Sequence, residues 1–226
     1  MSARKKAAKR RSSYNEKSIE IKPRNKKQEE YLAQLLDFKQ YIVFGVGPAG
    51  TGKTLLAVKA AIKAFRERQV DKIVITRPAV PVDEDHGHLP GTLEEKMAPW
   101  MMPIYDVFSE HFSSNEIQSM IADRVIEIAP LAYMRGRTFK HSYIIADEMQ
   151  NATTEQMKML LTRIGEGSIM AVTGDPNQTD RVSNNGMYDF MLRLANTKSS
   201  YVTMTEFKKE HVERHVAVSE VLRIYS

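Results

Sequence analysis

YIVFGVGPAGTGKT, residues 41–54, is the stretch from which the fold of this 226-residue chain can be inferred. Its first six residues form an apolar, β-branched-rich run of strand length, which leads into a glycine-rich turn. Residues 55–68 then have the apolar spacing of an amphipathic helix. The turn fits the pattern GxxxxGK[ST], and a strand before it with a helix after it is the setting of a phosphate-binding loop. The sequence therefore predicts a site for a nucleoside triphosphate.

The residues of this loop have distinct expected roles. Backbone N–H groups of the loop converge on phosphate oxygens, and the N-terminus of the following helix adds the positive end of its dipole. Lys53 is expected to reach the β- and γ-phosphates, and Thr54 to offer its hydroxyl to Mg²⁺. The predicted nucleotide-binding residues of the loop are Gly47, Pro48, Ala49, Gly50, Thr51, Gly52, Lys53, Thr54 and Leu55.

Composition limits the classes of protein to which the chain can belong. There are no cysteines, which excludes disulfides, thiolate zinc sites and thiol catalysis. No segment approaches the roughly 20 apolar residues of a membrane span. The basic N-terminus is not followed by an apolar run, so it does not resemble a secretory signal. We expect a cytoplasmic protein with no membrane partner.

Positive charge is concentrated at the N-terminus. Residues 1–27 hold eleven Lys or Arg against two Glu, whereas the remaining residues hold 22 basic and 26 acidic side chains. Because residues 1–24 are also poor in apolar side chains, they are predicted to form a basic tail that is disordered when free. The tail could serve only solubility, or it could grip a nucleic acid through its phosphates.

Strands alternate with helices along residues 25–226, which predicts one α/β domain with a parallel sheet and right-handed crossovers. The expected strands are residues 41–46, 72–76, 124–129, 143–146, 168–173 and 201–205. The expected helices are residues 25–37, 55–68, 93–112 with breaks at Pro99 and Pro103, 113–123, 153–164, 186–195 and 210–224.

Two further segments supply side chains for the predicted site. Asp147 follows the apolar run YIIA and is expected to hold Mg²⁺ from a strand end, while Glu148 beside it fits a base that activates water. Gln178 also follows a strand, so it should lie at the same carboxyl edge of the sheet and could contact both water and the γ-phosphate. The alternatives without a catalytic role are a charge pair at a helix N-terminus for Asp147 and Glu148, and a plain turn for the segment that contains Gln178.

Five motifs occur together and in order, and they carry a resemblance to a known family: GPAGTGKT, LPGTLEEKMAPWMMPIYDVF, PLAYMRGRTF, IIADEMQNAT and TGDPNQTD. They resemble the PhoH-like family, phosphate-starvation-inducible P-loop ATPases with a RecA-like core related to superfamily-1 helicases. The resemblance covers residue 25 to the C-terminus and implies a RecA-like three-layer sandwich with a mainly parallel sheet. Where the family commonly has DEAQN this chain has Met149, a change from which we expect little consequence.

The resemblance also implies roles for residues outside the loop. Gln28 stands where helicase-like relatives place a glutamine that recognises adenine, which favours ATP as the nucleotide. The segment Thr76-Arg77-Pro78 stands where those relatives have a segment that touches the nucleic-acid backbone. Arg214 resembles an arginine that approaches the γ-phosphate, although it could equally be a surface arginine on a helix.

Arg135 and Arg137 have no evident structural need, and arginines beside a glycine suit contact with phosphate, either that of an RNA backbone or that of a neighbouring subunit's ATP. The helicase relatives pair two RecA-like domains, and an arginine from the second completes the site of the first. This chain is long enough for only one such domain. The resemblance therefore implies a homo-oligomeric ring, with six subunits as the expected number and Arg135 or Arg137 as the catalytic arginine donated in trans.

Three functions are compatible with the sequence. The first is a Mg²⁺-dependent ATPase that couples hydrolysis to single-stranded RNA or DNA, with helicase-like activity. The second is an ATP-driven switch or assembly factor that acts on a protein partner. The third is a small-molecule kinase, which is least favoured because no segment resembles a lid or an acceptor pocket.

Overall fold

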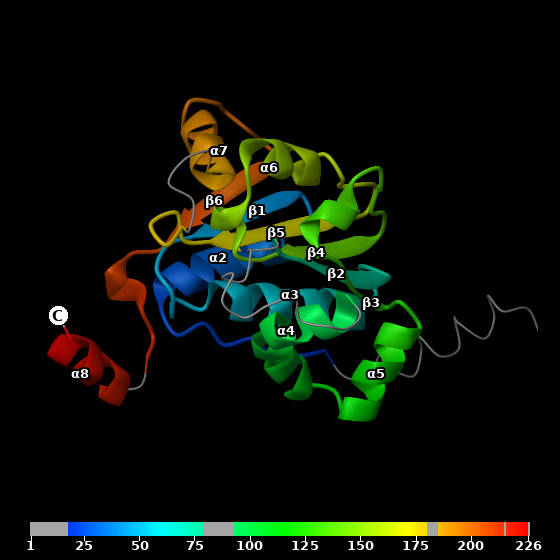
Figure 1. Cartoon of the computed structure of the whole chain (residues 1–226), viewed down its shortest axis with the longest axis horizontal. Helices are drawn as coiled ribbons and strands as arrows, with labels where there is room; N and C mark the ends of the chain where they lie inside the picture. The colour runs from blue at the N-terminus through cyan, green and yellow to red at the C-terminus, as the bar shows by residue number, and fades with distance from the viewer. Residues whose placement is uncertain (1–17, 79–92, 180–184, 215, 226) are drawn as a thin grey trace, which may run out of the picture.

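A computed structural model describes residues 18–78, 93–179, 185–214 and 216–225 of the chain (Figure 1). A six-stranded sheet lies at its centre with the order β3-β2-β4-β5-β1-β6, and every neighbouring pair of strands is parallel. The strands are β1 (Ile42–Val46), β2 (Lys72–Thr76), β3 (Ile126–Ile128), β4 (Ser142–Ala146), β5 (Ile169–Gly174) and β6 (Val202–Glu206). The predicted parallel α/β sheet is confirmed.

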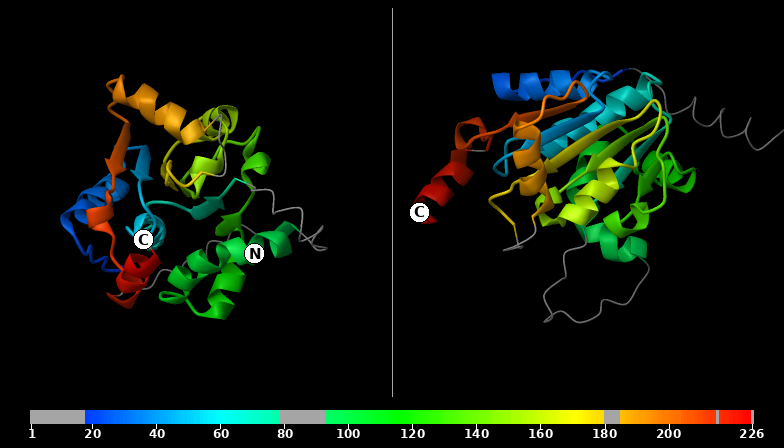
Figure 2. Two further views of the ribbon diagram at one scale, coloured as in Figure 1. Left: turned by 60° about the vertical axis from the view of Figure 1, so that its left-hand side comes forward. Right: turned by 90° about the horizontal axis from the view of Figure 1, so that it is seen from above.

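Helices cover both faces of this sheet, giving the predicted three layers (Figures 1 and 2). One side carries α2 (Lys26–Leu36), α3 (Lys53–Arg66), α4 (Leu93–Ser109) and α5 (Ser114–Ala122). The other side carries α6 (Thr154–Leu161) and α7 (Gly186–Ala195). The remaining elements are α8 (Val216–Tyr225) and the short 3₁₀ turns η2 (Leu131–Met134), η3 (Met149–Asn151) and η4 (Lys209–His211).

The core is divided into two parts by the sheet. Successive strand residues point to opposite faces, so Val43 packs with the α2 and α3 side chains while Phe44 packs on the α6 and α7 side. Ile145 and Ile144 divide in the same way. Because strands β1, β4 and β5 are covered on both faces, they are apolar along nearly their whole length rather than alternating.

The helices α5 and α6 both begin with a capping box. The Ser113 hydroxyl accepts from the Glu116 backbone N–H, and the Glu116 carboxylate accepts from the Ser113 N–H at 2.8 Å. Thr153 and Gln156 make the same reciprocal pair at the start of α6. Each cap satisfies two N–H groups that a helix leaves without an internal partner, so these two helix starts could be predicted from local sequence.

The structure corrects two predicted helices. α4 continues through Pro99 and Pro103 as one helix, because a proline removes one hydrogen-bond donor and the turns on either side retain theirs. The predicted helix over residues 210–224 is wrong in its first half: η4 ends at His211 and α8 begins at Val216. The backbone N–H of Glu213 donates to the Gly50 carbonyl at 2.9 Å, which holds the segment out of helical conformation.

The folded domain begins earlier than the predicted boundary at residue 25. Ile19 is buried in the core, and the Ser18 hydroxyl donates to Glu67 on α3 at 2.6 Å. Residues 18–24 therefore lie against the domain, while the rest of the predicted tail, residues 1–17, is outside the described part of the chain. Among the described residues, no helix has the length and apolar character needed to cross a membrane.

Candidate nucleotide-binding site

The glycine-rich loop connects β1 to α3 and has a backbone that only glycine tolerates at key points. Gly50 and Gly52 have φ values of 81° and 83°, in the left-handed region, and Gly52 is the N-cap residue immediately before α3. A Cβ added at Gly47 would lie 2.2 Å from the Phe207 carbonyl oxygen. The loop is thus held close to the end of β6 while the N-terminus of α3 opens toward the carboxyl edge of the sheet.

Lys53 folds over this loop and is nearly buried. Its Nζ donates to the carbonyl oxygens of Gly47 at 2.6 Å and Pro48 at 2.7 Å, and to the Thr51 hydroxyl at 3.2 Å. Burial lowers the pKa of the Lys53 ammonium, and the nearby carboxylates of Asp175, Glu148 and Asp147 oppose that shift. Lys53 therefore places a positive charge at the loop, close to the carboxylates of Asp147, Glu148 and Asp175.

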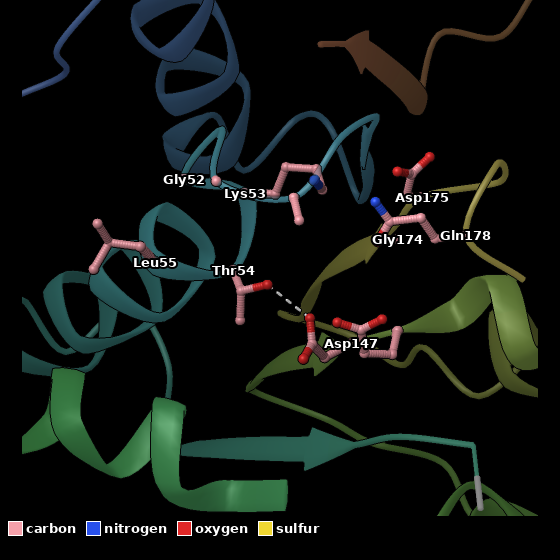
Figure 3. Close-up of a pocket in the computed structure, with 11 residues that line it drawn as sticks. Gly52, Lys53, Thr54, Leu55, Asp147, Gly174, Asp175 and Gln178 are labelled. Carbon is pink, nitrogen blue, oxygen red and sulfur yellow. Dashed lines mark hydrogen bonds between the residues drawn. The ribbon is translucent and has the colours of Figure 1, made fainter. Parts of the chain in front are cut away.

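Thr54 and Asp147 meet as the sequence predicts. The Thr54 hydroxyl donates to Asp147 Oδ1 at 2.7 Å (Figure 3). Thr173 donates to the same oxygen at 2.5 Å and fixes the carboxylate from β5. A hydroxyl and a carboxylate are hard oxygen ligands of the kind that Mg²⁺ prefers, so these side chains fit a magnesium ion.

Glu148 has an unusual backbone that aims its side chain into the site. Its φ of 54° lies in the left-handed region, which costs a non-glycine residue of order 1–3 kcal/mol and is often found at functional sites. The side-chain amide of Gln150 donates to Glu148 Oε2 at 2.5 Å, and its oxygen accepts from the Asp175 N–H at 3.2 Å. Gln150 thus connects the carboxylate to the loop that follows β5.

These groups surround one cavity of about 270 Å³ (Figure 3). Nine of the residues predicted from the sequence line it: Ala49, Gly50, Gly52, Lys53, Thr54, Leu55, Asp147, Glu148 and Gln178. Gly47, Pro48 and Thr51 are not among the lining residues and instead accept hydrogen bonds from Lys53. The structure therefore brings together, at one edge of the sheet, the loop, the two carboxylates and the glutamine.

Gln28 and Arg214 support the loop from outside the cavity. The buried Gln28 side chain donates to the Thr51 carbonyl at 3.0 Å and accepts from the Arg24 N–H at 2.8 Å. Arg214 donates to the Ala49 carbonyl at 3.1 Å from the extended segment before α8. Neither side chain is on the cavity wall in this conformation, so the adenine contact of Gln28 and the phosphate contact of Arg214 remain predictions.

Arg135 and Arg137 lie away from the cavity, after η2, and do not line it. Arg137 pairs with Glu127 on β3, and its guanidinium lies 4.5 Å from the centroid of the Phe139 ring. Arg135 is exposed. The two arginines therefore differ: the Arg137 guanidinium is held by contacts within its own domain, whereas the Arg135 side chain is exposed to solvent.

Gly174 and Asp175 also line the cavity; the sequence places them with Gln178 at the carboxyl edge of the sheet but assigns them no role of their own. Sequence reasoning missed two residues of the site, Gln150 and Thr173. Gln150 and Thr173 act through Glu148 and Asp147, and no local pattern marks such contacts.

A model of one protein family, described as PhoH-like protein, matches residues 20–226. The chain belongs to the PhoH-like family. The resemblance inferred from its motifs is confirmed. The PhoH-like protein of Bacillus subtilis (strain 168) is 41% identical over 213 residues, which are 93% of this chain and 66% of that protein. Protein PhoH of Escherichia coli (strain K12) is 40% identical over 210 residues, 91% of this chain and 58% of that protein.

The PhoH-like chain thus spans less than two thirds of the length of each of these relatives. Among solved structures, the UvsW helicase from bacteriophage T4 is similar with a TM-score of 0.48 and 15% identity, over 91% of this chain and 67% of that one. The Pif1 helicase from Candida albicans is similar with a TM-score of 0.42 and 18% identity, over 84% and 40% of the two chains. Family and site geometry together support a P-loop NTPase.

Proposed function

We propose that this PhoH-like domain binds ATP with Mg²⁺ and hydrolyses it, and that hydrolysis is coupled to single-stranded RNA or DNA. The observation that carries the proposal is the meeting of Lys53, the Thr54–Asp147 pair and Glu148 around one cavity. Each of these groups has a defined task in phosphoryl transfer to water. ATPases that activate water usually have a glutamate next to the Mg²⁺-binding aspartate, whereas kinases with the same phosphate-binding loop need none.

The residues divide the chemistry between them. Lys53 and the backbone N–H groups of the loop bind the β- and γ-phosphates, and Thr54 and Asp147 would hold Mg²⁺, which neutralises phosphate charge when bound. Glu148 accepts a proton from the attacking water, and Gln178, which lines the same cavity, orients that water. Gln150 keeps the Glu148 carboxylate aimed at the cavity.

Coupling to a nucleic acid is tested by the rate of ATP hydrolysis with and without single-stranded RNA or DNA at several salt concentrations. Stimulation that declines steeply with salt supports the proposal, because phosphate contacts release counterions. A response that is flat with respect to nucleic acid favours the ATP-driven switch, and a soluble phosphorylated product favours the kinase.

The basic tail is expected to contribute to nucleic-acid affinity. Residues 1–17 hold seven Lys or Arg and one Glu. Deleting these residues should lower the affinity for a single-stranded oligonucleotide about tenfold at low salt. It should also flatten the salt dependence of binding, by roughly 0.7 in logarithmic slope for each phosphate that is no longer neutralised. Fluorescence anisotropy of a labelled oligonucleotide measures both quantities.

A scrambled tail of the same composition is the matched control and should restore binding, since the attraction depends on charge and not on order. ATP binding by the truncated chain shows that the domain is folded. Equal affinity and equal salt slope with and without residues 1–17 would reduce the tail to a solubilising role.

We further propose a ring in which each subunit completes the site of its neighbour. α8 projects from the body of the domain (Figures 1 and 2) and exposes the apolar side chains of Val216, Val218, Val221 and Ile224. Exposed apolar side chains of this kind are suited to burial against another subunit. Arg135 is the better candidate for the donated arginine because Arg137 is paired with Glu127.

Arg135→Ala should therefore lower ATP hydrolysis by about 10³-fold, as expected for loss of an arginine that stabilises the transition state. Mixing Arg135→Ala subunits with Glu148→Gln subunits should restore part of the activity, because some interfaces then combine an intact base with an intact arginine. Arg193→Ala, on the exposed face of α7, is the control. High specific activity of the unmodified chain in dilute monomer would refute the ring.

A further inference from the structure

A second cavity, of about 500 Å³, adjoins the nucleotide cavity and shares two of its lining residues, Glu148 and Gln178. Its other walls include Arg77 at the end of β2, Trp100 on α4, Asn151 in η3 and Thr179 after β5. Because β2, β4 and β5 are adjacent parallel strands, these residues converge at the carboxyl edge of the sheet. This edge is where ligands of open α/β sheets bind.

Trp100 differs from its neighbours on α4. Met101, Ile104 and Phe108 are buried in the core, so the packing of the helix is provided by them. Trp100 is only partly buried: it packs against that core and also lines the cavity. A tryptophan in this position offers a supported aromatic surface to the cavity.

The chemistry of the walls matches one nucleotide of a single strand. An aromatic ring stacks on any nucleobase, and a guanidinium such as that of Arg77 binds a backbone phosphate. The side chains of Asn151, Gln178 and Thr179 add hydrogen-bond donors and acceptors for base edges or sugar hydroxyls.

We propose that this cavity holds one nucleotide of a single-stranded nucleic acid, with its base stacked on Trp100 and an adjacent phosphate on Arg77. This inference rests on the proposed function and names the place where the strand meets the ATP site. Since the two cavities share Glu148 and Gln178, a strand bound here lies beside the residues that act on water. A nucleotide bound in the second cavity therefore contacts the same two residues that act in the ATP cavity, so its binding can alter hydrolysis directly.

The chain contains one tryptophan, so its intrinsic tryptophan fluorescence reports on the surroundings of Trp100, at the wall of this cavity. Titration of the full chain, with ATP and Mg²⁺ present, with a single-stranded oligouridine or oligothymidine is expected to quench this fluorescence. An oligomer of equal length made of abasic sugar-phosphate units is the matched control, because it has the backbone charge and lacks the bases. It should bind through charge and leave the fluorescence unchanged.

Two substitutions test the stacking itself. Trp100→Phe keeps an aromatic ring, so its affinity for the oligonucleotide should be within about threefold of that of the unmodified chain. Trp100→Leu keeps an apolar side chain against the core but removes the aromatic ring, so its affinity should be about tenfold lower. Binding to the abasic oligomer should be equal in both variants. Thermal unfolding of both variants shows whether the substitutions are tolerated by α4.

The outcomes separate this inference from the function on which it rests. Oligonucleotide binding and stimulated hydrolysis without quenching, together with equal affinity of the Phe and Leu variants, would overturn the stacking site and leave the proposed function intact. Absence of any binding to either oligomer by anisotropy would overturn both. Quenching by the base-containing oligomer alone, with the Leu variant weakened, supports the inference.

Discussion

Glu148→Gln is expected to leave ATP binding within about threefold of the unmodified chain and to lower the turnover rate by about 10²- to 10⁴-fold, the usual contribution of a general base. Glutamine has the shape of glutamate, and its side-chain oxygen can still accept the hydrogen bond that Gln150 donates at 2.5 Å. The change therefore removes the proton acceptor and preserves the cavity. Calorimetry with ATP and Mg²⁺ measures the binding, and release of inorganic phosphate measures the turnover.

Two companion variants define the meaning of that result. Glu166→Gln makes the same chemical change at an exposed position that does not line the cavity and should have no effect on either measurement. Asp147→Asn should raise the Mg²⁺ concentration needed for half-maximal hydrolysis, because its carboxylate is placed beside the Thr54 hydroxyl. Near-normal hydrolysis by Glu148→Gln would show that this glutamate is not the base.

The part of the site that could be predicted from the sequence is the part that depends on local geometry. Lys53 and Thr54 occupy fixed positions in a loop whose backbone is set by its own glycines. Asp147 was recognisable because it follows a buried strand, and parallel strands end at the same edge of a sheet. Capping boxes at Ser113 and Thr153 were equally local.

The part that could not be predicted depends on strand register and on long-range contacts. β4 and β5 pair with Ala146 beside Val172, and this register places Thr173 next to Asp147. A shift of one residue would have turned Thr173 to the other face of the sheet. No periodicity in the sequence encodes which register is chosen, so the contact appears only in the folded structure.

The last predicted helix was wrong for a related reason. Residues 212–214 lie over the glycine-rich loop, with the Glu213 N–H on the Gly50 carbonyl and the Glu213 carboxylate accepting from Asn25 at 2.8 Å. These bonds join three segments that are far apart in sequence. Helical periodicity predicted a continuous helix there, and tertiary hydrogen bonds replaced its first turns.

Lys53→Ala is expected to weaken ATP binding by about ten- to a hundredfold, which corresponds to the roughly 1.5–3 kcal/mol of hydrogen bonds made by a charged group. Lys53 is the cation of the loop, and its ammonium is within hydrogen-bonding distance of the Gly47 and Pro48 carbonyls that frame the phosphate site. Alanine removes the charge and preserves the helix, since alanine has the highest helix propensity. Calorimetric titration with ATP at fixed Mg²⁺ measures the loss.

Lys63→Ala is the matched control, because Lys63 lies on the same helix and pairs with Glu67 on the outer surface. A surface pair of this kind contributes about 0.3–0.5 kcal/mol to stability, so this variant should bind ATP as the unmodified chain does. Weakening in Lys53→Ala alone locates the triphosphate at the loop. Equal ATP affinity in the two variants would mean that the nucleotide is bound elsewhere, and the roles assigned to Asp147 and Glu148 would then have no phosphate on which to act.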